Sequence, residues 1–121
     1  MKTRIFREKN VNIAEVISKE LEIQTVQDVL DLIANVDYEG ARNIIVHETI
    51  FAPEFYDLKT RIAGEILQKV AQYNIKLAIV GEFEKYESKS LNAFIVESNR
   101  GKNLFFVPDI QSAIQKLILL Q

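Results

Sequence analysis

Three residues of the chain have side chains suited to acid–base chemistry: His47, Glu48 and Glu82. His47 and Glu48 follow the apolar run Ile44–Val46, and Glu82 follows the run Leu77–Val80 and one glycine. Histidine titrates near neutral pH, and two carboxyl groups held together can act as acid and base or bind Mg²⁺ with water. If the two runs are neighbouring strands, their polar ends meet. The sequence therefore offers a candidate catalytic site at one edge of a sheet.

The same three residues also have a purely structural interpretation. A lone histidine beside β-branched residues is often a half-buried side chain bound to a backbone carbonyl, and acidic residues commonly solvate strand ends. No G-x-S-x-G motif is present, and the four glycines are too far apart for a phosphate-binding loop. One histidine without cysteine cannot form an ordinary zinc site. We therefore expect no metal and no cofactor, and leave open whether the chain is an enzyme.

A second group of polar residues lies where two helices are expected to begin. It comprises Asp57, Lys59, Thr60, Arg61, Ser88, Lys89 and Ser90. Free amides and the positive dipole end at a helix start attract anions. Lys59 and Arg61 are cations where the dipole favours negative charge, which suggests recruitment of an anion or of a partner's acidic group. The alternative is that these residues are caps and solvated charges.

The strands that would position these residues are visible as apolar patterns. Thr3–Arg7 and Ile13–Ile17 alternate apolar and polar residues, and Glu8–Asn10 between them indicates a hairpin turn. Three further runs are apolar on both faces, as strands of a parallel sheet are. These runs are Asn43–Val46, Leu77–Val80 and Leu104–Val107.

Four helices are expected from apolar residues at helical spacing, each behind a capping side chain. The caps are Thr25 (with Asp28 completing a capping box), Asp57, Ser88 or the residue before it, and Asp109. The first helix is expected to stop before Gly40. The third is expected to end at Gly101, which suits the left-handed position after a helix.

The order of elements is strand, strand, then helix and strand three times, then a last helix. It predicts a single α/β domain over residues 1–121, with a mostly parallel, five-stranded mixed sheet and helices packed on it. Right-handed crossovers put the last four strands parallel and the first strand antiparallel at an edge. Ligands of open α/β sheets bind at the carboxyl ends of the strands, where both polar groups should gather.

Composition narrows the class of protein. With 121 residues, 48% of them apolar, the chain can bury a core as one domain. The net charge of −2 is spread along the chain without a basic stripe, so we expect neither a nucleic-acid partner nor a membrane surface. The longest apolar runs have four residues, which is too short for a membrane span. The charged N-terminus shows no export signal, and the absence of cysteine fits the cytoplasm.

Three blocks of sequence resemble the bacterial family called domain of unknown function 4180. The blocks are Phe55–Lys69, Leu77–Phe83 and Ser88–Gly101. The resemblance implies a fold and a cytoplasmic setting, and it brings no activity. Glycine is common in that family where this chain has Arg61, so the chain departs from the family pattern near the start of the second helix.

The order of elements is also similar to that of the STAS domain, the fold of anti-sigma-factor antagonists. In that group a strand-to-helix turn carries a phosphorylatable serine. Leu58 and Lys59 stand where the serines would be, so Thr60 is the remaining hydroxyl candidate and the phosphorylation switch is in doubt.

Three functional hypotheses follow. The first is a small cytoplasmic, STAS-like regulatory or binding module that contacts a protein or a small anionic ligand at the strand-end edge, with Phe51, Phe55 and Tyr56 as an exposed aromatic patch. The second is a small hydrolase or acid–base enzyme that uses His47 with Glu48 or Glu82. The third is a homodimer formed through an exposed strand or the apolar stretch Leu117–Leu120.

Overall fold

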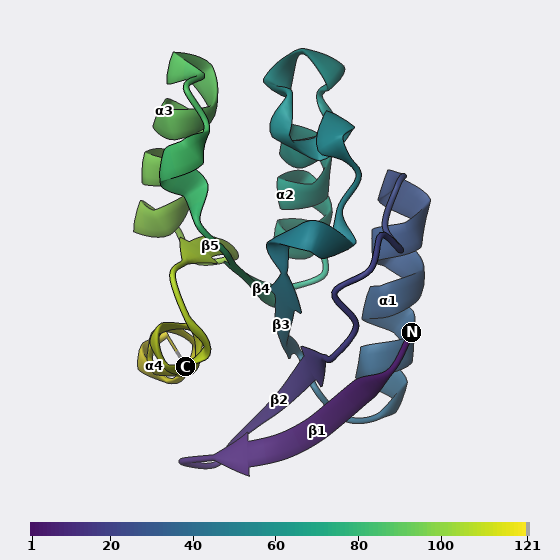
Figure 1. Ribbon diagram of the computed structural model, residues 1–121. Helices are drawn as coiled ribbons and strands as arrows, with labels where there is room; N and C mark the ends of the chain where they lie inside the picture. The colour runs from purple at the N-terminus through teal and green to yellow at the C-terminus, as the bar shows by residue number, and fades with distance from the viewer. Residues whose placement is uncertain (121) are drawn as a thin grey trace.

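Five strands form one mixed sheet whose spatial order follows the order of the chain (Figure 1). The computed structural model describes residues 1–120. The strands are β1 (Thr3–Glu8), β2 (Val11–Val16), β3 (Asn43–His47), β4 (Lys76–Val80) and β5 (Leu104–Val107). β1 pairs antiparallel with β2, and every other neighbouring pair is parallel. The predicted α/β fold and its order of elements are confirmed.

Three helices connect the parallel strands and cover one face of the sheet, and the last helix crosses the other face (Figure 1). The helices are α1 (Val26–Tyr38), α2 (Ile62–Gln72), α3 (Lys89–Arg100) and α4 (Ile110–Leu119). Within residues 1–120, none of them has the length and apolar character that crossing a membrane requires.

Alternation along the central strands divides the core into two layers. On β3, Ile44 and Val46 belong to the core between the sheet and α1–α3, whereas Ile45 belongs to the core under α4. All three side chains are at most 1% exposed. Apolar residues on both faces are therefore required, which explains the continuous apolar runs in the sequence.

The hairpin turn requires an unusual backbone conformation. Lys9 and Asn10 both have positive φ, 46° and 69°, so they form a two-residue turn of type I′. This turn suits the twist of paired strands. It also sets the register, in which Glu8 lies opposite Val11 and Thr3 opposite Val16.

Three of the four predicted helix caps are confirmed. The capping box of Thr25 and Asp28 is complete, the Leu91 amide donates to the Ser88 hydroxyl, and the Ser112 amide donates to the Asp109 carboxylate. The carboxylates of Asp28 and Asp109 accept backbone N–H bonds, which lowers the pKa of each.

The prediction for Gly101 is wrong, because its φ is −87°; the left-handed residues after α1 and α2 are Gly40 and Asn74, with φ of 90° and 55°. The prediction for Asp57 also needs correction. Asp57 caps only a single 3₁₀ turn, Leu58–Thr60. Arg61 then adopts the left-handed conformation, with φ of 67°, and so separates the 3₁₀ turn from α2, which begins at Ile62. Glycine adopts such a conformation without strain, which agrees with the glycine that the resemblance implied at this position.

The connections leave the carboxyl edge without a crevice of the usual kind. In doubly wound sheets, a ligand crevice opens where two neighbouring connections pass to opposite faces. Here α1, α2 and α3 all lie on the same face and the strand order never reverses. The carboxyl edge is therefore built by short loops and single-turn 3₁₀ helices.

Candidate functional site

The carboxylate of Glu48 is the centre of a polar cluster at the carboxyl edge. It accepts a hydrogen bond from the backbone N–H of Glu82 at 3.1 Å and one from the hydroxyl of Tyr86 at 3.4 Å, and it pairs with the Lys85 ammonium at 2.9 Å. Its side chain is only 13% exposed. The Glu48 pairing raises the pKa of Lys85, and burial, followed by the Glu48 charge, raises the pKa of Tyr86.

This cluster joins the loop after β3 to the loop after β4. Glu48 and Glu82 are neighbours, as the strand order led us to expect, but Glu82 takes part through its backbone amide. An acid–base pair needs two carboxyl groups in different protonation states. Among the described residues no hydrogen bond joins the two carboxyl groups, so the acid–base pair stays a prediction.

Three aromatic residues after β3 are buried, so the predicted exposed aromatic patch is wrong. Phe51, Phe55 and Tyr56 are 4%, 1% and 8% exposed. The rings of Phe51 and Phe55 stack with centroids 4.2 Å apart, and Phe55 meets Tyr56 edge-on at 4.8 Å. The Tyr56 hydroxyl donates to the Glu48 carbonyl at 2.6 Å, and burial raises its pKa well above the usual range. These rings are a second small core under the edge.

A shallow groove of about 340 Å³ lies beside this cluster. Its lining residues are Leu21, Glu48, Thr49, Phe51, Pro53, Tyr56, Lys85 and Tyr86. The rings of Tyr56 and Tyr86 stack at 5.0 Å and form one wall. The Glu48 carboxylate has three partners in this cluster without a ligand, and these contacts link the loop after β3 to the loop after β4.

His47 lies away from both predicted carboxylates. It shares the α4 face of the sheet with Glu15 of β2, and its Nε2 atom is 3.9 Å from the Glu15 carboxylate. That carboxylate also pairs with Arg4 at 2.9 Å. The three residues form a row across β1, β2 and β3. The catalytic hypothesis paired His47 with Glu48 or Glu82, and neither contact is present within residues 1–120.

The pKa of His47 is lowered, mainly by burial and then by the charge of Lys19, although Glu15 opposes the shift. The unfolded chain therefore binds more protons than the folded chain below about pH 6.5. We expect the free energy of unfolding to be largest above pH 6.5 and to fall as the pH drops through the folded pKa. Urea unfolding between pH 5.5 and 7.5, with NMR titration of the single histidine, measures this. His47→Gln should remove this component, and an unchanged slope in the variant would contradict the assignment.

Two of the four predicted binding residues before α2, Asp57 and Thr60, are engaged with nearby backbone groups. The Thr60 hydroxyl lies 2.7 Å from the Glu54 carbonyl and 2.8 Å from the Asp57 carbonyl, so it is occupied as a donor. The Asp57 carboxylate accepts a hydrogen bond from the backbone amide of Lys59, and the Lys59 side chain is exposed to solvent. Arg61 lines a groove between α2 and α3 whose far wall is Phe94. The Thr60 phosphorylation switch and a binding role for this group stay predictions.

The remaining predicted binding residues lie at the start of α3. Ser88 is committed as its cap, and Lys89 and Ser90 are exposed on its first turn. Within residues 1–120, no hydrogen bond or ion pair joins them to Asp57–Arg61. The same described residues hold no cluster of three or more His, Cys, Asp or Glu side chains suited to a metal ion. A binding surface that includes both segments therefore stays a prediction.

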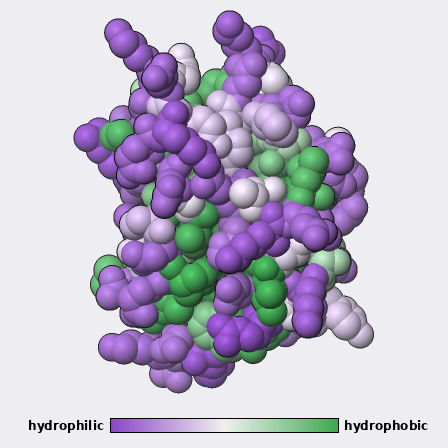
Figure 2. All heavy atoms as spheres, in the orientation of Figure 1, coloured by the Kyte–Doolittle hydropathy of each residue, from purple (hydrophilic) through white to green (hydrophobic). Residues whose placement is uncertain are grey.

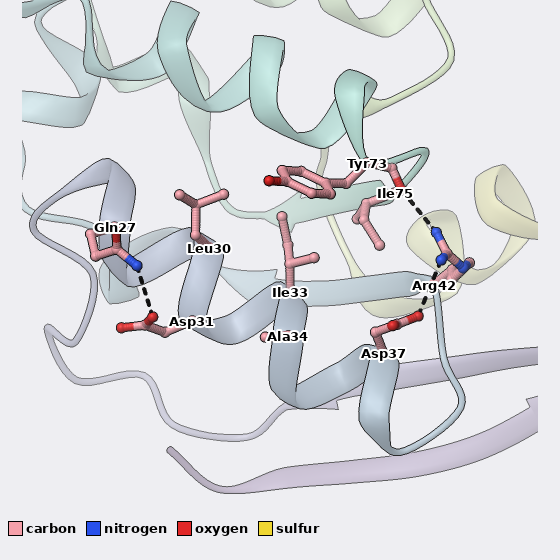
Figure 3. Close-up of a pocket in the computed structure, with 9 residues that line it drawn as sticks. All are labelled: Gln27, Leu30, Asp31, Ile33, Ala34, Asp37, Arg42, Tyr73 and Ile75. Atoms are coloured by element: carbon pink, nitrogen blue, oxygen red, sulfur yellow. Dashed lines mark hydrogen bonds and ion pairs between the residues drawn. The ribbon is translucent and has the colours of Figure 1, made fainter.

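The largest of the grooves described here lies between α1 and the end of α2, and sequence reasoning missed it (Figure 3). Its volume is about 460 Å³, within the usual range for binding sites. Its lining residues are Gln27, Leu30, Asp31, Ile33, Ala34, Asp37, Arg42, Tyr73 and Ile75. Figure 3 shows the Tyr73 ring extending over the apolar floor of Leu30 and Ile33. A sequence signal was present: the exposed side of α1 carries the acidic residues Asp31 and Asp37, and the small apolar residue Ala34 lies between them in the sequence.

Polar contacts close the two ends of this groove. At one end Arg42 pairs with Asp37 at 3.2 Å and donates to the Tyr73 carbonyl at 2.8 Å. At the other end the Gln27 amide donates to the Asp31 carboxylate at 3.0 Å (Figure 3). Asp31 has no cationic partner among residues 1–120. The groove therefore combines an apolar floor with an uncompensated negative charge on its rim.

Comparison with known families gives a match over most of the chain. The family model described as a domain of unknown function (DUF4180) matches residues 8–117. The chain belongs to this family. In this DUF4180 chain the match spans β2 to most of α4 and leaves out most of β1. No curated protein matches the sequence.

Proposed function

We propose that this protein is a small binding module that docks a short, basic, amphipathic segment of a partner protein in the groove between α1 and α2. The observation that supports it is the combination of an apolar floor with an acidic rim in the largest groove described. We place the module in the cytoplasm, in keeping with a chain that has no cysteine.

The apolar part of the proposed partner would occupy the floor of the groove. Leu30 and Ile33 of α1 line it, and the half-exposed ring of Tyr73 offers a flat apolar face with 46% of its surface accessible. Ala34 is small and exposed, so it leaves room for a side chain from outside. Amphipathic helices commonly dock in such grooves through a few apolar anchors.

The basic part of the partner would meet the acidic side of α1. This helix carries Asp28, Asp31 and Asp37 and contains no lysine or arginine. Asp28 is used as a cap, and Asp37 is neutralised by Arg42. Asp31 is left to attract a cation, and the chain as a whole has a net charge of −2. We therefore expect binding to weaken as salt is added.

Binding of a designed probe tests the proposal. The probe is a 14-residue helical peptide with leucine on one face and lysine on the other, compared with the same peptide carrying glutamate for lysine. We expect NMR shift changes at Leu30, Ala34 and Tyr73 with the lysine peptide only. Asp31→Lys should raise its dissociation constant about three- to ten-fold, since one exposed ion pair contributes up to about 1 kcal/mol and a like charge opposes binding.

Glu97→Lys is the matched control. Glu97 is an exposed acid of α3 that pairs with Arg100, so this variant changes the net charge equally at a distance from the groove. It should leave the dissociation constant within about two-fold of wild type, a difference of roughly 0.4 kcal/mol. An equal loss in both variants, or shift changes confined to the carboxyl edge, would show that the α1–α2 groove is not the site.

A further inference from the structure

The two edges of the sheet differ in their availability for pairing. At the β5 edge, the side-chain amide of Asn99 bonds both backbone groups of Phe106, accepting from its N–H at 2.8 Å and donating to its C=O at 3.2 Å. A further strand beside β5 would have to form its hydrogen bonds with the same N–H and C=O groups of Phe106, and the Asn99 side chain already occupies them. At the other edge, β1 is the outermost strand and no helix packs beside it (Figure 1). Only the β1 edge is open to another strand.

The hairpin register shows which backbone groups of β1 are free to pair. Opposed residues of antiparallel strands alternate between pairs that exchange hydrogen bonds and pairs that do not. The Ile17 amide donates to the Lys2 carbonyl at 2.9 Å, so the even-numbered residues of β1 bond to β2. Thr3, Ile5 and Arg7 therefore direct their N–H and C=O groups outward.

From these features we propose that two copies of this chain pair antiparallel through β1, with Ile5 opposite Ile5 of the second copy at the two-fold axis. The result is one continuous ten-stranded sheet across the dimer. Ile5 is an apolar side chain left 36% exposed on this edge, and the pairing covers it. A two-fold axis of this kind uses the same surface on both copies.

The charges of β1 favour this register over its neighbours. With Ile5 on the axis, Lys2 of each copy lies opposite Glu8 of the other, which gives two symmetric pairs of opposite charge. Both residues are exposed, and neither forms an ion pair within residues 1–120. A shift of one pair toward the N-terminus places Arg4 opposite Arg4, where like charges repel.

A shift in the other direction also loses this complementarity. Phe6 would then lie on the axis, and Ile5 would face Arg7 of the second copy. Arg4 would face Glu8, but Arg4 already pairs with Glu15 in its own chain. Lys2 would have no acidic partner. The register centred on Ile5 therefore covers the Ile5 side chain and also places Lys2 opposite Glu8.

Figure 2 shows a competing surface on the same molecule. Apolar atoms gather in the lower left of this face, where Figure 1 places α4, and Leu119 of that helix is 80% exposed. A dimer through α4 would bury that area in place of β1. The two arrangements respond to different substitutions, so one experiment separates them.

Sedimentation equilibrium across a concentration series is the test. Wild type should show a concentration-dependent dimer. Ile5→Pro should be monomeric at every concentration, because proline removes an outward N–H without removing a bond to β2. Leu119→Glu should dimerise as wild type does. A monomeric wild type up to about 0.5 mM, well above the range of specific complexes, or loss of the dimer in Leu119→Glu, would overturn the proposal.

A charge exchange keeps the test decisive even if Ile5→Pro unfolds. Lys2→Glu and Glu8→Lys each place two like-charged pairs across the two-fold axis, so each alone should weaken dimerisation about ten-fold. An equimolar mixture restores both opposite-charge pairs and should return to within about three-fold of wild type. Failure of the mixture to recover would exclude this register.

Discussion

Replacing Phe55 by alanine should lower the free energy of unfolding by about 3–5 kcal/mol. Phe55 is 1% exposed and is the ring on which the aromatic cluster is assembled. It stacks on Phe51 at 4.2 Å, meets Tyr56 at 4.8 Å and lies 6.4 Å from the ring of Phe106. The short 3₁₀ segments around it cannot collapse onto the cavity, because their neighbours are anchored to β3 and β5.

Urea unfolding of wild type and Phe55→Ala measures this loss. Tyr38→Ala is the control, since Tyr38 is 93% exposed and removal of its ring should change the stability by less than about 0.5 kcal/mol. NMR shifts of Tyr56 and Tyr86 should also change in Phe55→Ala, because the carboxyl edge rests on this ring. A loss below about 1 kcal/mol would mean that the aromatic cluster is not a core.

Gly81→Ala should lower the free energy of unfolding by about 1–3 kcal/mol. A Cβ atom at position 81 would lie 2.7 Å from three carbons of the Glu48 side chain, closer than such atoms approach. Glu48 would have to move, and its carboxylate would lose the Glu82 amide and the Lys85 ammonium. The expected cost combines overpacking with a weakened polar cluster.

Two controls isolate this effect in the same urea measurements. Gly64→Ala meets nothing within 4 Å in the first turn of α2 and should instead stabilise the protein by about 0.5–1 kcal/mol, as alanine does in helices. In a Glu48→Ala background the cost of Gly81→Ala should shrink by about 1 kcal/mol, because most of the colliding atoms are gone. Additive effects would show that the clash is with another group.

The fold could be predicted because local signals and the final structure agree. The capping box at Thr25 and the caps at Ser88 and Asp109 act over three residues, so the sequence contains the whole interaction. Strands β3, β4 and β5 are apolar on both faces because helices cover both faces. Helix caps depend on residues three positions apart, and buried strands need apolar residues at every position, so a single sequence shows both.

The start of α2 could not be predicted, because two local signals compete there. Asp57 is a good cap, and the residues after it favour a helix. The loop from β3 must also bury Phe55 and Tyr56 against distant residues of α3 and β5, and the helix begins only after Arg61 turns the chain. Burial of rings outweighs a cap, since one buried ring contributes several kcal/mol and a cap about one.

The candidate site was predicted less well than the fold. Strand order placed Glu48 beside the end of β4, but it could not show that a backbone amide and Lys85 would take up its carboxylate. His47 and Glu48 are adjacent in sequence and reach different partners, because His47 lies on the α4 face and contacts Glu15.

The amino-acid sequence by itself determined the class of fold, the number and order of its elements and most helix caps, since these depend on periodicity and on contacts within one turn. Only the tertiary structure decided that α1, α2 and α3 share one face, that the β5 edge is blocked by Asn99 while the β1 edge is open, and that Asp31 borders an apolar groove. Those features join residues that are remote in the chain. Their positions depend on how whole elements pack, which no local pattern records.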